Sequence, residues 1–560
     1  MVDLSVLRSL DVEGVADPAA RALIRVLLGL IEQLAAENAA LRAENQHLKD
    51  ELARLKGQPP RPTSRPQSGP PGAGTNRDVS SEQPRREPRT WHKAAKLPAL
   101  TITRTERLRV DPTTLPADAV FKDLERVVVQ DLVIQVETVC FEKEVWYSPG
   151  ERRSYRAALP AGYSGQFGPG LKSLALALHF GANVTEAKLH ELFAQVGVRV
   201  STGWQSDLLS GDAAAFGAEA QAVERAGLKS SPWHHLDDTA TRVDGQNEHC
   251  QVLGNGLYTA YHTTQRKDRL SVLDALQGGR SPDERTYRWD ATAEAYLIWW
   301  GLSAAARQRL GSLPRDQALD AATFDQWEHG QTAWLGPQQR ARIREGLAIA
   351  AYHAQTDWPV VACLVCDDAP QFQQVTAELA LCWVHEGRHY AKLSPYVPQH
   401  QARLDAFRER FWQYYQELLA YKQQPTAAER ARLEAAFDVL FTAETGYAAL
   451  DARIALTRQK KADLLRVLAH PELPLHNNPA ELAARRRVRK RDASFGPRSA
   501  AGRWAWDTYQ TLAATAQQLG VPFLRYLHDR LTGAGQIPHL ADLLTARAAT
   551  LNFGASWAVP

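Results

Sequence analysis

The clearest hydrophobic pattern of the chain lies in residues 22–56. Leucine recurs there every seven residues, at Leu27, Leu34, Leu41, Leu48 and Leu55, and the a positions hold Ile24, Ile31, Asn38, Asn45 and Leu52. Leucine at d with asparagine at a is typical of a parallel coiled-coil dimer of defined register. An amphipathic helix on the protein's own core would show a similar stripe. The pattern therefore predicts a homodimer formed through residues 22–56, with that alternative open.

The helical period is lost in the next two segments. Residues 57–97 are expected to form a disordered linker, because 57–90 are rich in Pro, Gly, Ser and Arg. Between 98 and 168, apolar runs and period-two alternation within Arg126–Tyr147 predict a small β-rich domain.

The pattern turns helical again in residues 169–228. Thr185–Val196 and Ser201–Leu209 fit two helices, and Ser201 or Thr202 can cap the second of them. This spacing is compatible with a helix-turn-helix that reads DNA. Any short helical hairpin would look the same, so the sequence leaves both interpretations open.

The remainder of the chain alternates strands with helical blocks. A strand over 233–239, a turn near 244–247 and strands at 250–258 and 259–264 resemble the start of a ribonuclease-H-like sheet. A continuous apolar run at 358–366 predicts a buried central strand. Residues 280–356 and 394–472 read as helical insertions, and the tryptophans of the first fit core positions better than base-stacking ones.

Acidic residues end both of these strands. Asp237 and Asp238 lie at the end of the first strand, and Asp367 and Asp368 follow the buried one. Neighbouring strand residues point to opposite faces, so only one acid of each pair can enter a shared site. Aspartate is also a common turn residue, which is the ordinary alternative.

A third acid begins a strongly basic helix. Asn478 suits its N-cap, Pro479 its first turn, and Glu481 follows one turn before residues 485–491, of which six of seven are cationic. This arrangement suggests that a metal and phosphates are handled together. The ordinary alternative is a capping box with an i,i+4 pair between Glu481 and Arg485.

Composition limits the class of protein. A net charge of +3 means that affinity for nucleic acid must come from local clusters. The five scattered cysteines do not suit a secreted disulfide scaffold. Cys363 and Cys366 resemble half a metal knuckle, but in a strand they point to opposite faces, and we interpret them as buried small residues. With no signal peptide and no membrane-spanning run, a cytoplasmic, nucleoid-associated protein without a membrane partner is expected.

Three segments resemble motifs of the insertion-sequence 66 family of transposases. Residues 236–239 with Arg242-Val243 are similar to the family's "DET…RV" strand, and 382–385 with Arg388 to its "CWAHxRR" segment. Residues 477–481, followed by Arg485, Lys490 and Phe495-Gly496, resemble "NNxAER", the basic patch and "F.GS". The resemblance covers most of 20–535 except 280–356.

The resemblance implies an RNase-H-like DDE transposase. By position the catalytic and metal-binding acids are Asp237, Asp367 and Glu481, holding Mg²⁺ with Mn²⁺ as a substitute. The expected DNA contacts are Arg485, Arg487, Arg489, Lys490, Arg491, His385 and Arg388. Implied partners are transposon-end DNA, target DNA and accessory transposition proteins.

The chain also departs from the family pattern. The family usually carries a cysteine-rich zinc segment after the linker, whereas residues 58–249 hold only Cys140, so no zinc finger is expected. Asp238 stands for a glutamate and Gly387 for an arginine, and the match around Asp367 is loose. The choices between Asp237 and Asp238, and between Asp367 and Asp368, therefore stay open.

The predicted fold is α/β, an RNase-H-like mixed sheet with helical insertions, preceded by the coiled coil, the β-rich domain and the helix-turn-helix-like segment. The predicted function is metal-dependent cleavage and strand transfer at transposon ends. Alternatives are a non-catalytic dimeric DNA-binding protein derived from a transposase and an RNase-H-like nuclease. The predicted segments are 1–56, 57–97, 98–168, 169–228, 229–279, 280–356, 357–393, 394–472, 473–535 (the glutamate helix, basic patch and closing helices) and 536–560 (a tail).

Overall fold

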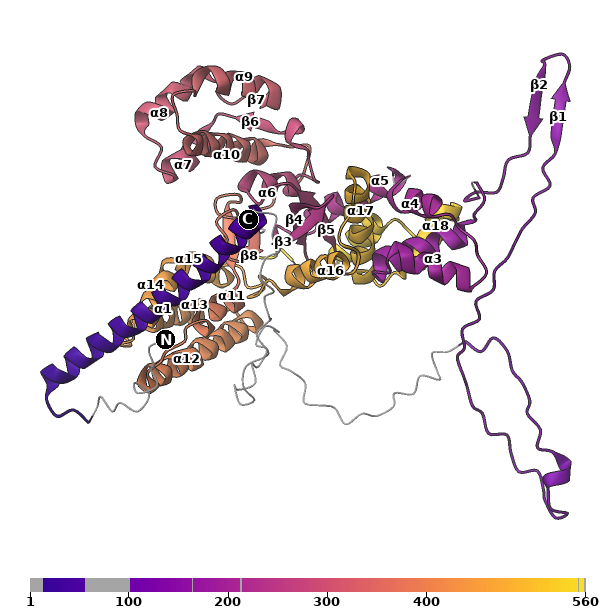
Figure 1. Cartoon of the computed structure of the whole chain (residues 1–560), viewed down its shortest axis with the longest axis horizontal. Coiled ribbons are helices and arrows are strands. Elements are labelled where there is room, and N and C mark those ends of the chain that lie inside the picture. The colour runs from indigo at the N-terminus through magenta and orange to yellow at the C-terminus, as the bar shows by residue number, and fades with distance from the viewer. Residues whose placement is uncertain (1–13, 56–100, 164, 212–213, 552, 558–560) are drawn as a thin grey trace.

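The computed structural model describes residues 14–55, 101–163, 165–211, 214–551 and 553–557 (Figure 1). The linker expected at 57–97 lies outside this range. Within the described residues, the helices are all too short or too polar to cross a bilayer.

A five-stranded mixed sheet forms the centre of the protein, in the order β5-β4-β3-β8-β9. The first three strands make an antiparallel meander, and β8 and β9 add parallel to β3 and to each other. The predicted mixed α/β core is therefore present. The strands are β3 (Trp233–Val243), β4 (Gln246–Gly254), β5 (Thr259–Thr264), β8 (Cys363–Cys366) and β9 (Glu378–Leu381).

Strand β3 is longer than expected. It continues through the acids to Val243, so the prediction that it ends at Asp237 and Asp238 is wrong. The turn into β4 is Asp244-Gly245, and both residues have positive φ, at 48° and 74°. Asp-Gly suits such a tight hairpin because both positions require the left-handed region. β3 therefore continues beyond His235, where its pairing with β8 stops, and stays paired with β4 up to Val243.

Both faces of the sheet are covered. Leu236, Leu253 and Leu364 pack into a core with α6 and α10 on one face. Val252 and Tyr261 pack on the other face with alanines of α16 and α17. These helices are α6 (Arg269–Leu276), α10 (Pro337–Ala354), α16 (Asn478–Ser494) and α17 (Ala500–Gln518).

Helix α17 also closes the edge of the sheet. The backbone N–H groups of Thr259, Tyr261 and Thr263 donate to side-chain oxygens of α17. Their acceptors are Thr515, Thr511 and Asp507, spaced four residues apart on one face of the helix. An edge strand whose donors are satisfied in this way offers no free pairing row to another chain.

The first insertion contains more strand than expected. Its helices are accompanied by a two-stranded sheet of β6 and β7. The prediction of buried tryptophans holds for Trp289, whereas Trp299 and Trp334 are exposed. The elements are η5 (Pro282–Glu284), β6 (Thr286–Arg288), α7 (Ala291–Trp299), α8 (Ala304–Arg309), η6 (Leu310–Ser312), β7 (Ala318–Asp320) and α9 (Ala321–Gln331).

The second insertion follows its predicted pattern. One face of its first long helix is buried and carries Leu404, Phe407, Phe411, Tyr414, Leu418 and Tyr421. The helices around it are α11 (Trp383–Ala391), α12 (Pro398–Gln423), α13 (Ala427–Phe441), α14 (Ala448–Gln459), α15 (Lys461–Leu464) and η7 (Arg466–Leu468).

The segment 169–228 is helical and shares one core with the C-terminal helices. Thr185 and Ser201 cap α3 and α4 by accepting from the N–H groups of Lys188 and Trp204. The elements are α2 (Pro169–Leu176), η4 (Ala177–Gly181), α3 (Glu186–Gln195), α4 (Thr202–Ser210), α5 (Ala214–Lys229), α18 (Phe523–Thr532) and α19 (Leu540–Ala548).

The expected β-rich domain is reduced to one hairpin. Within 101–163 the strands are β1 (Val145–Ser148) and β2 (Arg153–Arg156), with a short η3 (Pro112–Thr114) before them. This hairpin projects away from the sheet (Figure 1). In the described part of the chain, the apolar residues at 127–129 and 132–134 belong to no strand, and all but Val128 are exposed.

Helix α1 (Pro18–Leu55) lies alongside the helices of the second insertion (Figure 1). Ile24 and Leu28 pack on Val397, just before α12. Glu32 accepts hydrogen bonds from His400 and from the N–H groups of Tyr396 and Val397. The described d-position leucines, Leu27, Leu34, Leu41 and Leu48, remain exposed.

Candidate active site

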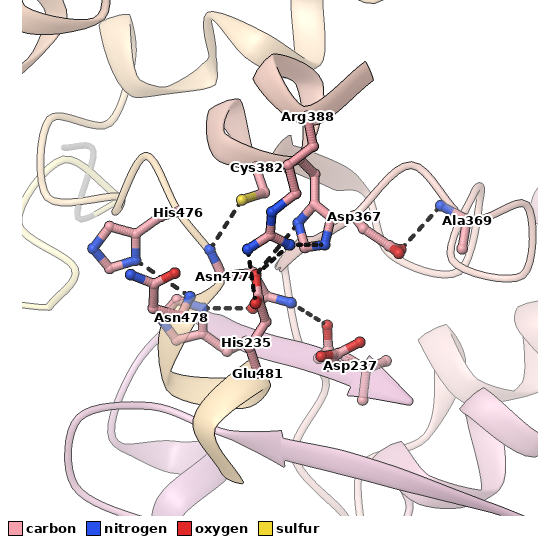
Figure 2. A network of polar contacts seen from close by, with 12 residues as sticks. His235, Asp237, Asp367, Ala369, Cys382, Arg388, His476, Asn477, Asn478 and Glu481 are labelled. Atoms are coloured by element: carbon pink, nitrogen blue, oxygen red, sulfur yellow. Dashed lines mark hydrogen bonds and ion pairs between the residues drawn. The ribbon is translucent and has the colours of Figure 1, made fainter. Parts of the chain in front are cut away.

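Three acidic residues converge where β3 and β8 separate (Figure 2). The parallel pairing of these strands stops at His235 and Val365. Asp237 lies two residues further along β3, and Asp367 directly follows the last residue of β8. Glu481 is in the first turn of α16, which packs across β3 and β4.

The neighbouring acids, Asp238 and Asp368, have other partners. Asp238 is 2.7 Å from Lys267 Nζ and accepts a hydrogen bond from Gln371 at 2.6 Å. Asp368 is 2.5 Å from Lys460 Nζ. Strand alternation accounts for the division between Asp237 and Asp238, which are consecutive residues of β3.

The converging carboxylates affect one another electrostatically. Burial raises the pKa of Asp237 to about 7, and the negative charges of Asp367, Asp238 and Glu481 act in the same direction. The N–H of Asp238, which donates to Asp237 at 2.9 Å, opposes this rise. A buried carboxylate crowded by like charges is stabilised by a cation. Carboxylate oxygens are the ligands that a hard divalent ion prefers.

Glu481 is not a capping-box residue. The N-cap of α16 is Asn477, so the expected cap at Asn478 is wrong by one residue and Glu481 is the fourth helical position. Its carboxylate is 3.1 Å from Arg388 Nη2 and 3.5 Å from Arg485 Nη2. The i,i+4 pair with Arg485 is present, but it is the longer of the two contacts.

Asn477 links the elements that carry the acids, a role that sequence reasoning missed. Its buried side chain donates to the carbonyl of Leu236 at 2.8 Å, and its Oδ1 pairs with His235 Nδ1 at 2.9 Å (Figure 2). Its backbone N–H points to Cys382 Sγ at 3.3 Å. Burial lowers the pKa of His235 to about 3, so its imidazole is neutral and Nδ1 donates. Because the side chain of Asn477 bonds to β3, it does not cap α16.

The cations of α16 divide between surface and interior. Arg485 and Arg489 are exposed, and Arg491 is half-buried and donates to the carbonyl of Ala240 at 2.6 Å. Arg486 and Arg489 line a cavity of ≈ 520 Å³ together with Asn183, Tyr261, Gln510 and Gln517. The exposed arginines of α16 can contact a phosphodiester backbone.

Arg487 and Lys490 differ from the expectation that they contact DNA, because both are buried. Arg487 is 1% exposed and forms an ion pair with Asp507 of α17. Lys490 donates to the carbonyl of His179 at 2.7 Å and lies 4.7 Å from the ring of Trp506. Burial and the charge of Arg487 lower the pKa of Lys490 to about 7. Both side chains hold α16 in place.

His385 and Arg388 lie on α11, next to Glu481. Arg388 Nη1 donates to His385 Nε2 at 3.0 Å, and the guanidinium contacts both carboxylate oxygens of Glu481. Burial lowers the pKa of His385, and the charge of Arg388 adds to this effect. In this state Arg388 binds a carboxylate instead of DNA.

The cysteines of β8 are separated as predicted. Cys363 packs in the core beside Trp233, and Cys366 packs in the core on the other face of the sheet. Burial raises the pKa of Cys366 well above its ordinary value. The pair is therefore not a metal knuckle.

Comparisons with known proteins give two matches. The family model described as "Transposase IS66 family" matches residues 341–504. The "Uncharacterized protein y4jO" of Sinorhizobium fredii is 33% identical over 327 residues, which cover 58% of this chain and 99% of that protein. No solved structure matches the chain.

Proposed function

Since this chain belongs to the IS66 family of transposases, we propose that it cleaves transposon ends and transfers the strands into target DNA by metal-dependent phosphoryl transfer. The observation that carries this proposal is the convergence of Asp237, Asp367 and Glu481 at the divergence of β3 and β8. The order of the five strands supports an RNase-H-like core.

The metal in this proposal is Mg²⁺, with Mn²⁺ as a substitute. Asp237, Asp367 and Glu481 would hold it, and their crowded carboxylates support this assignment. When bound, such ions activate a water or a 3′-hydroxyl and stabilise the leaving oxygen. Asn477 keeps β3 and α16 in register, so that the first and third acids face the same space.

We assign the DNA backbone to three cations of α16, of which Arg485 and Arg489 are exposed and Arg491 is half-buried. Arg485, Arg489 and Arg491 extend from the same helix as the acid, within about 15 Å of it along the axis. Arg388 is 43% exposed at its side chain, which leaves it free to turn from Glu481 toward a phosphate. Neutralised phosphates release counterions, so binding should weaken steeply with salt.

A dimer formed through α1 is part of the proposal. The exposed leucines at 27, 34, 41 and 48 form the d stripe of the heptad and support pairing with a second copy. Two copies would present two active sites to the two transposon ends. Transposon-end DNA, target DNA and accessory transposition proteins are the proposed partners.

The direct test uses purified protein, labelled transposon ends, and Mg²⁺, Mn²⁺ or no divalent ion. Asp237→Asn and Asp367→Asn should lose cleavage by orders of magnitude and still shift the DNA in a gel. Asp238→Asn and Asp368→Asn are matched controls that remove a charge one residue away, where the acid contacts a lysine. If the controls lose cleavage and the first pair does not, the assignment of the acids is wrong.

Glu481→Gln separates the catalytic role from the local one. Glutamine keeps the shape but removes the charge that a metal requires. Cleavage should fall by orders of magnitude, while the melting temperature in metal-free buffer and end binding stay close to the parent. An active variant would refute the role of Glu481 as a metal ligand. Protein that binds ends but never cuts them would instead favour a DNA-binding function.

A further inference from the structure

A cysteine and a histidine flank the third acid of the site. Cys382 is the N-cap of α11, and His385 follows within its first turn. One ligand atom of each of Cys382, His385 and Glu481 lies within 4.8 Å of the others. Two ligands of one zinc ion, each about 2.0–2.3 Å from it, are separated by at most about 4.6 Å. Small side-chain rotations would therefore bring all three onto a single ion.

The chemistry of these ligands differs from that of the carboxylate set. Mg²⁺ prefers oxygen ligands, whereas a thiolate and an imidazole select Zn²⁺ or Co²⁺. Three protein ligands leave a fourth tetrahedral position open. The Cys-His-Glu set is therefore suited to a softer ion than the one proposed for phosphoryl transfer.

Two features of the structure prepare this set for a cation. The buried Nδ1 of His385 makes no hydrogen bond in the described part of the chain and lies 3.6 Å from Glu481 Oε1. The other ring nitrogen, Nε2, accepts from Arg388, whose guanidinium also neutralises Glu481. A positive charge already occupies the position next to two of the three ligands. An arriving ion would replace the charge of Arg388, and that side chain has solvent to move into.

We propose that Cys382, His385 and Glu481 bind a thiophilic divalent cation, Zn²⁺ being the natural candidate, in place of the guanidinium of Arg388. The site shares Glu481 with the Mg²⁺ ligands, so the two ions compete for one carboxylate. Zn²⁺ bound there withdraws Glu481 from phosphoryl transfer. This inhibitory consequence rests on the proposed function, but the binding itself does not.

Co²⁺ is the probe, because a cobalt–thiolate bond gives a charge-transfer absorption in the near ultraviolet. Titrating the metal-free full-length protein should produce this band with one equivalent of Co²⁺, and Zn²⁺ should abolish it. Cys382→Ser should lose the band, and Glu481→Gln should bind Co²⁺ at least about tenfold more weakly. Arg388→Ala should bind it more tightly, since the competing charge is gone.

Two controls make the result specific. Cys140→Ser changes the exposed cysteine outside the site, and Asp237→Asn changes an acid of the Mg²⁺ set only; both should keep the band. If Cys382→Ser fails to fold by thermal melt, His385→Gln provides a second variant that should weaken binding. Absence of the band in folded parent protein, or its persistence in Cys382→Ser, overturns the proposal.

A cleavage assay separates this site from the proposed function. Zn²⁺ added to Mg²⁺ should slow cleavage by the parent, and the ratio of rates with and without Zn²⁺ should return toward one in Cys382→Ser. A cobalt band in protein that never cleaves DNA refutes the transposase activity and leaves the site standing. Mg²⁺-dependent cleavage without a cobalt band refutes the site alone.

Discussion

Helix α1 leaves its d-position leucines in solvent, whereas α16 buries two of the cations that make its sequence so basic. Leu34 is 58% exposed, and Arg487 is 1% exposed. Both arrangements reverse what side-chain polarity alone would suggest. The two helices differ in their neighbours: α1 touches the rest of the described chain near residues 24–32, while α16 lies between the sheet and α17.

This difference shows that the pattern of polar and apolar residues along a helix limits the contacts that the helix can make. The elements that pack against it determine which of those contacts form. The d-position leucines of α1 stay exposed, because its contact with Val397 is made by Ile24 and Leu28. The basic stripe of α16 meets Asp507, three aromatic rings and a backbone carbonyl, which together accommodate two buried cations.

The largest loss of stability is expected when the buried ion pair between Arg487 and Asp507 is removed. Arg487→Met leaves Asp507 without its buried partner, so the free energy of unfolding should fall by about 3–5 kcal/mol. Arg485→Met, at a position 60% exposed on the same helix, should change it by less than about 0.5 kcal/mol. Denaturant titration of both variants measures the difference. Equal stabilities would mean that α16 does not use the two arginines differently.

The stripe of α1 is tested by charging it. Leu34→Glu with Leu41→Glu places like charges at successive d positions, so the protein should become monomeric by light scattering. The melting temperature of the folded core should not change, because these leucines are exposed within one chain. Val26→Glu, at another exposed position of the same helix, is the control and should leave the mass of the dimer intact. A dimer that survives the double substitution would remove α1 from the interface.

The buried Lys490 of α16 should make the stability of the protein depend on pH. Its pKa is about 7 in the folded protein, below the ordinary 10.5, so the unfolded chain binds the extra proton between these values. Stability should therefore rise with pH through this window, by at most about 1.4 kcal/mol per pH unit. Lys490→Met should flatten that part of the profile, measured by denaturation at pH 7, 8 and 9. An unchanged profile would show that Lys490 stays charged against its aromatic neighbours.

The smallest effect should come from the exposed arginines of α16. Arg485→Ala with Arg489→Ala removes two phosphate contacts, so the slope of log affinity against log salt should fall by about 2. Fluorescence anisotropy with end DNA at several salt concentrations measures it, with folding stability unchanged. Arg430→Ala, exposed on α13, is the control. If the salt slope does not change, DNA does not follow this face of α16.

Much of the secondary structure was readable because it depends on local chemistry. Ser201 caps its helix, Asp244-Gly245 makes the hairpin turn, and residues 404–421 bury one helical face. The three acids were also named from the sequence, which left open the choices between Asp237 and Asp238 and between Asp367 and Asp368. The position of the α16 cap was missed because the side chain of Asn477 donates to Leu236 of β3, a residue 241 positions away in the chain.

By itself the sequence determined the periodic elements, the turns and the residue types available for chemistry, since each follows from interactions a few residues apart. Only the tertiary structure decided that Arg388 binds Glu481, that Cys382 and His385 stand beside it, and that Arg487 and Lys490 are interior. It likewise left one hairpin where alternation predicted a sheet. Burial and pairing depend on which distant surfaces meet, and a local pattern holds no information about its partner.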